Sequence, residues 1–188
     1  MSSSACSLVG NGLASAKRTE ASTAPSTTIA RAPAVDLWVV EANTRGPFAE
    51  ASRIPGDIRE AVARIADVTA AGSITYQTVE TEHGGDKLRL YVIGYELTRP
   101  GGPPQIAEGR EIARSHYEMV ADKSSGLTLG ERIRLGRHVF TVVGLTRHQV
   151  NSGGDPAVYI TLAVAQNLEF DLAPPAARVQ LARGGGGS

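Results

Sequence analysis

The stretch from Leu127 to Leu145 most constrains the fold, because it reads as two short strands joined by a tight turn. Ile133 and Leu135 alternate with arginines, which is the period-two pattern of a strand with one buried face. Gly136-Arg137 supplies the Gly-X pair of a two-residue hairpin turn. The β-branched and aromatic run from Val139 to Val143 predicts the returning strand. The stretch therefore predicts a β hairpin, and none of its residues indicates catalysis.

A strand and a helix are predicted earlier in the chain, with ordered structure beginning near Ala34. Leu37 to Val40 is a continuous apolar run, which is typical of a strand covered on both faces. Residues 55–67 predict a helix, because apolar residues recur at helical spacing and Pro55 suits a first turn. The apolar stripe consists of Ile54, Ile58, Val62 and Ile65.

A long hairpin follows, with strands predicted over 73–82 and 87–97. Its turn is His83-Gly84-Gly85-Asp86, and a Gly-Gly pair is what a tight turn needs sterically. Because this tip ends a long ribbon, we expect His83, Gly84, Gly85 and Asp86 to contact a partner. The plainer interpretation is a turn with no further role.

Two loop-rich breaks divide the rest of the chain, at Thr98–Pro104 and Asn151–Pro156. Residues 34–98 and 150–183 are predicted to form one α+β part, a mixed sheet with covering helices. Residues 99–149, with a short strand at 117–121 and the first hairpin, form a small inserted β-rich part. After the second break we expect a buried strand at 157–162, a helix at 163–169 and a last strand at 176–181.

Both ends of the chain differ in composition from the predicted fold. Residues 1–33 are rich in Ser, Thr and Ala, and we expect a partly disordered stalk or linker. Residues 184–188 are Gly-Gly-Gly-Gly-Ser, which is typical of an engineered flexible linker. No window approaches the ~20 apolar residues of a membrane-spanning helix. We therefore expect a domain cut from a larger protein.

Composition excludes several classes of partner and site. The 19 basic and 19 acidic residues balance, so no global field attracts nucleic acid, and we predict no nucleic-acid partner. Aromatic residues, at 5%, are too sparse for a platform that stacks bases. Cys6 is the single cysteine, so an intramolecular disulfide and a thiolate metal cluster are both excluded.

No motif for catalysis, cofactor binding or metal binding was found. The four histidines (His83, His116, His138 and His148) form no pair at i+3 or i+4 and no H-E-x-x-H pattern. Ser152 lies in a glycine-rich loop, but it has no Gly-x-Ser-x-Gly elbow, so a plain loop is favoured over a hydrolase. There is no P-loop and no dinucleotide fingerprint. The sequence thus predicts no catalytic residue, no cofactor and no metal.

The inserted part is locally basic, with four arginines and two histidines, namely Arg132, Arg134, Arg137, Arg147, His138 and His148. One interpretation is a contact with an acidic partner or a lipid headgroup. The plainer interpretation is the solvated face of a strand pair.

The order of short segments along residues 35–170 resembles one family of transport proteins. The segments are Asp36-Leu-Trp-Val-Val, Val92-Ile-Gly-Tyr-Glu, Ile106-Ala-Glu-Gly-Arg, Tyr117-Glu-Met-Val-Ala-Asp, Leu129-Gly-Glu-Arg-Ile-Arg-Leu-Gly, Phe140-Thr-Val-Val-Gly-Leu, Pro156-Ala-Val-Tyr-Ile-Thr-Leu and Ala165-Gln. Together they resemble the extracytoplasmic core domain of ABC transporter permeases of the MacB, FtsX and LolC/LolE type. The Asp-Leu-Trp-Val opening is most similar to the DevC-type branch.

The resemblance implies a location, partners and a mechanism. Such a domain follows the first membrane helix of a permease in the inner (cytoplasmic) membrane and faces the periplasm or the extracellular side. The permease is a homodimer and pairs with a cytoplasmic ABC ATPase. ATP-driven motion of the membrane helices moves the outer domain, which acts on a substrate or on a partner such as a periplasmic adaptor. The implied role is mechanotransmission, without enzymatic activity.

The family often has Gly-Asp where this chain has Gly130-Glu131, so the acidic charge of this turn is kept. The alternative to a permease domain is a free-standing extracellular binding or assembly module of α+β fold, with no ATPase partner.

Overall fold

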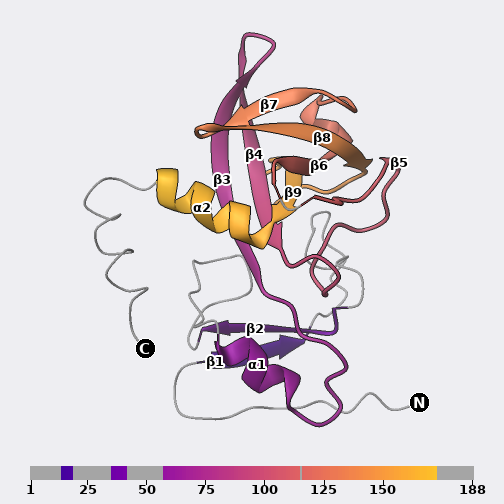
Figure 1. The fold of residues 1–188 in the computed structure, drawn as a ribbon, viewed down its shortest axis with the longest axis vertical. Coiled ribbons are helices and arrows are strands. Elements are labelled where there is room, and N and C mark those ends of the chain that lie inside the picture. Colours follow the sequence, from indigo (N-terminus) through magenta and orange to yellow (C-terminus); the bar gives the residue numbers. More distant parts are fainter. Residues whose placement is uncertain (1–13, 19–34, 42–56, 115, 173–188) are drawn as a thin grey trace.

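The computed structural model describes residues 14–18, 35–41, 57–114 and 116–172 (Figure 1). Within these ranges the strands form a two-stranded sheet and a seven-stranded sheet. The elements are β1 (Ala14–Arg18), β2 (Leu37–Glu41), α1 (Asp57–Ala63), β3 (Ile74–His83), β4 (Asp86–Tyr95), β5 (Glu108–Gly109), β6 (Glu118–Asp122), the 3-10 helix η1 (Lys123–Ser125), β7 (Arg132–Leu135), β8 (His138–Thr146), β9 (Ala157–Thr161) and α2 (Leu162–Leu172).

The small sheet pairs β1 with β2 in antiparallel register, from Ala14 opposite Glu41 to Arg18 opposite Leu37. The strand predicted near Leu37 is confirmed, but the prediction that it is covered on both faces is wrong. Leu37 is 37% exposed, and among the described side chains of β2 only Val40 is buried, so the run is not covered along its whole length. The prediction that order begins near Ala34 is also wrong, since β1 precedes it.

The large sheet has the strand order β3-β4-β9-β6-β8-β5, with β7 also paired to β8. The β4–β9 and β6–β8 pairs are parallel and the other pairs are antiparallel, so the sheet is mixed. The predicted α+β class with a mixed sheet is confirmed.

β4 and β9 pair side by side, and the residues between them in the chain supply β5, β6, β7 and β8 of the same sheet. Because β6 pairs with both β8 and β9, strands of the two predicted parts share one sheet. The boundaries of the inserted part at 99 and 149, and the stalk assigned to 1–33, stay predictions. The strand predicted at 176–181 and the linker at 184–188 lie outside the described residues.

Both faces of the large sheet are buried at its centre. Leu90 and Val92 of β4 join the apolar cluster under α2, whereas Tyr91, Ile93 and Tyr95 join a second cluster on the opposite face. This alternation follows from the period of two in a strand, and burial on both faces requires the continuous apolar run that β4 has. All five residues of β9 are buried as well, as its sequence predicts.

Both predicted hairpins are present, and the sheet curls until β7 lies beside β3. The β3–β4 turn has positive φ at Gly84 and Gly85, and the β7–β8 turn has φ of 59° at Gly136. Across the open seam between β3 and β7, the Thr81 hydroxyl donates to the Arg134 carbonyl oxygen at 2.6 Å. Figure 1 shows the β3–β4 ribbon running past the rest of the sheet.

The helix predicted over 55–67 is shorter within the described residues, where α1 covers Asp57–Ala63 and turns follow. The chain enters a left-handed conformation at Asp67, with φ of 70°, which no α-helix accommodates. Of the predicted apolar stripe, Ile58, Val62 and Ile65 are half-buried, as is Arg59 beside them, and Ile54 lies outside the described residues. Arg59 of α1 donates to Glu96 at 2.7 Å, and the Ser73 amide donates to the same carboxylate at 2.8 Å, so Glu96 fixes α1 and the start of β3 to the end of β4.

Helix α2 rests directly on β4 at Gly94. A Cβ atom at Gly94 would lie 2.3 Å from Cβ of Ala165 and 2.8 Å from Cγ2 of Thr75. We predict that Gly94→Ala destabilises the domain by about 1–3 kcal/mol, because the helix must move away from the sheet. Urea unfolding followed by circular dichroism measures this change. The control Gln166→Ala, on the exposed face of α2, should shift the unfolding free energy by no more than about 0.5 kcal/mol. Equal stability of Gly94→Ala and wild type would contradict this packing.

Candidate partner-contact sites

The predicted contact at the β3–β4 tip is exposed only in part. Gly84, Gly85 and Asp86 are exposed, whereas His83 is half-buried because its Nε2 atom lies 2.7 Å from Oε1 of Glu131. The tip is therefore tied at its base to the loop before β7, and three residues project beyond that tie. The assignment of His83, Gly84, Gly85 and Asp86 to a partner contact stays a prediction.

Glu131 organises the turn that receives His83. Its Oε2 atom accepts hydrogen bonds from the Thr128 amide at 2.8 Å and the Thr128 hydroxyl at 3.0 Å. These bonds, the amide first, together with His83, hold the pKa of Glu131 below its ordinary value despite some burial. Here the acidic residue that follows Gly130 caps its own turn and anchors the hairpin tip.

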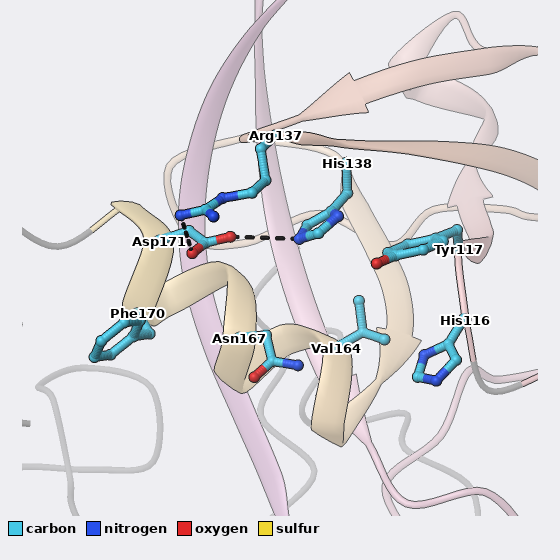
Figure 2. Close-up of a pocket in the computed structure, with 8 residues that line it drawn as sticks. All are labelled: His116, Tyr117, Arg137, His138, Val164, Asn167, Phe170 and Asp171. Carbon is cyan, nitrogen blue, oxygen red and sulfur yellow. Dashed lines mark ion pairs between the residues drawn. The ribbon is translucent and has the colours of Figure 1, made fainter. Parts of the chain in front are cut away.

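A second site is a pocket of about 220 Å³ between α2, the β7–β8 turn and the residues before β6 (Figure 2). It combines polar and apolar side chains from these three segments. The lining residues are His116, Tyr117, Arg137, His138, Val164, Asn167, Phe170 and Asp171.

Asp171 of α2 holds one wall of the pocket together. Its carboxylate lies 2.6 Å from a guanidinium nitrogen of Arg137 and 3.3 Å from Nε2 of His138. The ring of Tyr117 stacks on His138 with centroids 4.8 Å apart and an interplanar angle of 20°. The same ring meets Phe140 edge-on at 5.6 Å. The end of α2 and the β7–β8 turn are thus joined by charge, and an aromatic ring covers the junction.

The segment that carries Tyr117 is fixed by a nearly buried carboxylate, Glu118. It accepts from the Arg110 guanidinium at 2.6 and 3.0 Å, from the Ala113 amide at 2.9 Å and from the Arg114 amide at 3.0 Å. Arg110 first, then the two amides, overcome the effect of burial and lower the pKa of Glu118 to about 2. Glu118 therefore closes the loop over 110–118 and sets the position of Tyr117.

The basic residues of the inserted part differ in their surroundings. Arg137 and His138 line the pocket. Arg132 and Arg134 are exposed on one face of β7, and the alternating residues Ile133 and Leu135 are buried on the other face. Both interpretations of the exposed β7 arginines, a contact or a solvated face, stay open.

The loop around Ser152 uses its polar side chains to hold itself. Oδ1 of Asn151 accepts from the Gly153 and Asp155 amides at 2.9 and 2.8 Å, and its Nδ2 donates to Asp155 at 2.9 Å. This is a local turn stabilised by an asparagine side chain. It supports the plain-loop interpretation over the hydrolase.

Most of the pocket could not be read from the sequence. His116 was noted only as an isolated histidine. Arg137 and His138 were noted for local basic charge, and no role in a site was predicted for Tyr117, Glu118 or Asp171. Asn167 and Asp171 lie four residues apart on α2, but that spacing is common on exposed helix faces. Among the described residues, no three His, Cys, Asp or Glu side chains are grouped to hold a metal ion.

A family comparison decides the identity of this fold. The sequence model of the MacB-like periplasmic core domain matches residues 2–183. The chain belongs to this family. The assignment to the DevC-type branch stays a prediction.

The curated relatives of this MacB-like domain are named as permeases. Two uncharacterized ABC transporter permeases of Mycobacterium tuberculosis, from strains CDC 1551 / Oshkosh and ATCC 25618 / H37Rv, are each 27% identical over 140 residues. The match covers 74% of this chain and 40% of each relative, so the chain spans less than half the length of these permeases.

Two solved structures are similar to this MacB-like domain. The extracellular domain of the noncanonic ABC-type transporter YknZ from Gram-positive bacteria has a TM-score of 0.47 and 11% identity, covering 61% of this chain and 65% of the other. The periplasmic region of MacB from Actinobacillus actinomycetemcomitans has a TM-score of 0.42 and 15% identity, covering 58% and 55%. Over the described residues, neither helix has the length and apolar character required to cross a membrane.

Glu118 gives this MacB-like domain a pH-dependent stability. Its pKa is about 2 in the folded state against an ordinary 4.5, so below pH 4.5 the unfolded chain binds the proton more tightly. The stabilisation by Glu118 is therefore complete above about pH 4.5 and is lost as the pH falls toward 2. We predict that Glu118→Gln costs about 1–3 kcal/mol at pH 7.

The difference between wild type and Glu118→Gln should narrow as the pH falls from 4.5 toward 2. Urea unfolding at neutral pH and at several acidic pH values measures it. Glu111→Gln, at an exposed position in the same loop, is the control and should be neutral. A difference that does not change with pH would contradict the role given to the Glu118 carboxylate.

Proposed function

We propose that this chain is the extracytoplasmic domain of an ABC transporter permease subunit. In this proposal, it couples ATP-driven motion of the membrane helices to a substrate or partner outside the membrane. The observation that carries the proposal is the match of the MacB-like periplasmic core domain to residues 2–183. The permease names of the curated relatives support it.

The proposal includes partners and a location that the family implies. The parent permease would lie in the inner (cytoplasmic) membrane as a homodimer and bind a cytoplasmic ABC ATPase. The domain would face the periplasm or the extracellular side, where a periplasmic adaptor or another extracellular partner meets it. In this role the domain transmits movement and carries no catalytic residue.

The attachments of the β3–β4 ribbon support a mechanical role. Ten residues at about 3.3 Å each give a strand of roughly 33 Å. The ribbon is fixed near its base by Glu96, in the middle by a Gln77 hydrogen bond of 3.0 Å to the Ala165 carbonyl oxygen, and near its tip by His83. A packed body with so many attachments moves as a unit, so displacement at the base would reach the tip.

The tip is the contact that we propose for the outer partner. Its exposed residues are Gly84, Gly85 and Asp86, and Lys87 beside them is exposed as well. A Cβ atom built at Gly84 or Gly85 would meet nothing within 4 Å, so the backbone of the turn is open to a partner, and Lys87 beside it pairs with Glu80 at 2.9 Å. His83 would set the direction of the tip through its bond to Glu131.

The alternative is a free-standing extracellular binding module without an ATPase. Purification of the full-length parent protein in mild detergent separates the two proposals. We expect it in the membrane fraction, in complex with an ATPase subunit. Recovery of the full-length protein from the soluble fraction, alone, would favour the binding module.

Photocrosslinking tests the mechanical part. With benzoylphenylalanine in place of Asp86 in the full-length permease, we expect a crosslinked partner whose yield differs between the ATP-bound and nucleotide-free states. An ATPase variant that binds but does not hydrolyse ATP holds the first state. Thr78 is the control position, because it is exposed on β3, the other strand of the same ribbon, but lies below the tip. An equal crosslinking yield at position 86 in the ATP-bound and nucleotide-free states would contradict mechanotransmission through the tip.

A further inference from the structure

Exposed apolar side chains mark the pocket at the end of α2. Among the described residues, the large hydrophobic side chains that are clearly exposed are Leu37, Tyr117, Leu129 and Phe170. Tyr117 and Phe170, exposed by 41% and 40%, both line this pocket. Two apolar side chains left in water beside one hollow are typical of a surface that another molecule covers.

The backbone at Tyr117 gives a second reason. Its φ of 61° lies in the left-handed region, which a bulky residue rarely adopts. The conformation is maintained by the ring stacking on His138 and by the Glu118 hydrogen bonds on its other side. Residues whose strained backbone is held in place by surrounding contacts are concentrated at functional sites. Here it directs an aromatic ring across the pocket wall, as Figure 2 shows.

The pocket has one cation that is open to a further acceptor. Arg137 is 64% exposed although it contacts Asp171, so its guanidinium keeps donors for a second acceptor. Asp171 is the acidic residue of the lining, and both of its oxygens already face Arg137 and His138. His116 and Asn167 add exposed polar atoms at the rim.

The size of the pocket argues for a protein side chain. Its volume of about 220 Å³ is below the ~300–1,000 Å³ of typical small-molecule sites. Val164 and the two exposed rings form an apolar hollow with a cation at its edge. Such a hollow accommodates one large apolar side chain, and aromatic and arginine residues are those that dominate protein interfaces.

We propose that this pocket docks a partner protein through one apolar or aromatic side chain, while a neighbouring carboxylate of the partner binds Arg137. The inference goes beyond the proposed function and concerns a different surface from the hairpin tip. The pocket proposal depends only on the chemistry of the pocket. The crosslinking experiment at the hairpin tip can therefore fail while the peptide experiment below succeeds, and the reverse also holds.

A short peptide tests the pocket in the 188-residue chain. The probe is acetyl-Gly-Ser-Phe-Asp-Ser-Gly-amide, which carries both required features, and binding is followed by ¹⁵N NMR. We expect a dissociation constant on the order of 1 mM. Amide shifts should be confined to residues 116–117, 137–138 and 164–171. Replacing the probe's Phe by Ser, or its Asp by Asn, should weaken binding about threefold or more.

Protein variants assign the binding to the pocket. Arg137→Gln should weaken binding of the probe about threefold or more, whereas the matched control Arg134→Gln, on the same hairpin but outside the lining, should not change it. Phe170→Ser is a second variant, which removes an apolar wall at an exposed position without touching the ion pair. Thermal unfolding of each variant establishes that the fold is kept.

Several results would overturn the proposal. One is the absence of shifts at the pocket, and another is equal binding of the Asp and Asn probes. Equal affinity of wild type and Arg137→Gln would do the same. Vesicles of phosphatidylglycerol and phosphatidylethanolamine are the remaining comparison: if they perturb the same amides and displace the probe, the surface binds a membrane and the protein-docking proposal is wrong.

Discussion

The parallel pairing of β4 with β9 is the contact on which the rest of the domain depends. It runs from Tyr91 opposite Ala157 to Tyr95 opposite Thr161 and joins segments separated by the whole inserted part. β3 pairs with the outer side of β4, β6 pairs with the outer side of β9, and α2 follows β9 directly. Closing so long a loop costs entropy, which the burial of both strands on both faces offsets. The ribbon, the pocket and the curled sheet are all positioned from this pair.

Local chemistry made the hairpins predictable. Gly84, Gly85 and Gly136 have positive φ in these tight turns, and few residue types adopt that conformation. The strand over 157–162 and the helix after it were predicted for the same kind of reason, since burial and helix propensity act within a few residues. The breaks at 98–104 and 151–156 predicted an insert between two strands of one layer, and this division stays a prediction.

What the sequence did not reveal depends on contacts distant in the chain. Asp122 is 1% exposed and accepts from Thr146 and from the Gln149 amide, which hold the ends of β6 and β8 together. No sequence spacing predicts that a carboxylate such as Asp122 will bond to a distant segment, and the same is true of Glu118 and Asp171. The exposure of Leu37 escaped prediction because an apolar run indicates burial only when a second layer covers it. Tyr117 was not predicted because its backbone conformation depends on His138 of β8 and on the Glu118 hydrogen bonds that close its own loop.

The place of β6 beside β9 has a consequence for shortening the domain. The insert enters at the carboxyl end of β4 and leaves at the amino end of β9, so a replacement must cross the sheet and a two-residue turn is too short. Even a long enough replacement would leave β9 as an edge strand, with Ala-Val-Tyr-Ile-Thr and its unpaired amides open to solvent. Flat apolar edges of this kind pair with other chains and aggregate. We therefore expect relatives to vary in the loops between β5 and β8. We expect β6 to be kept, because it covers the edge of β9 and prevents that edge from pairing with another copy of the domain.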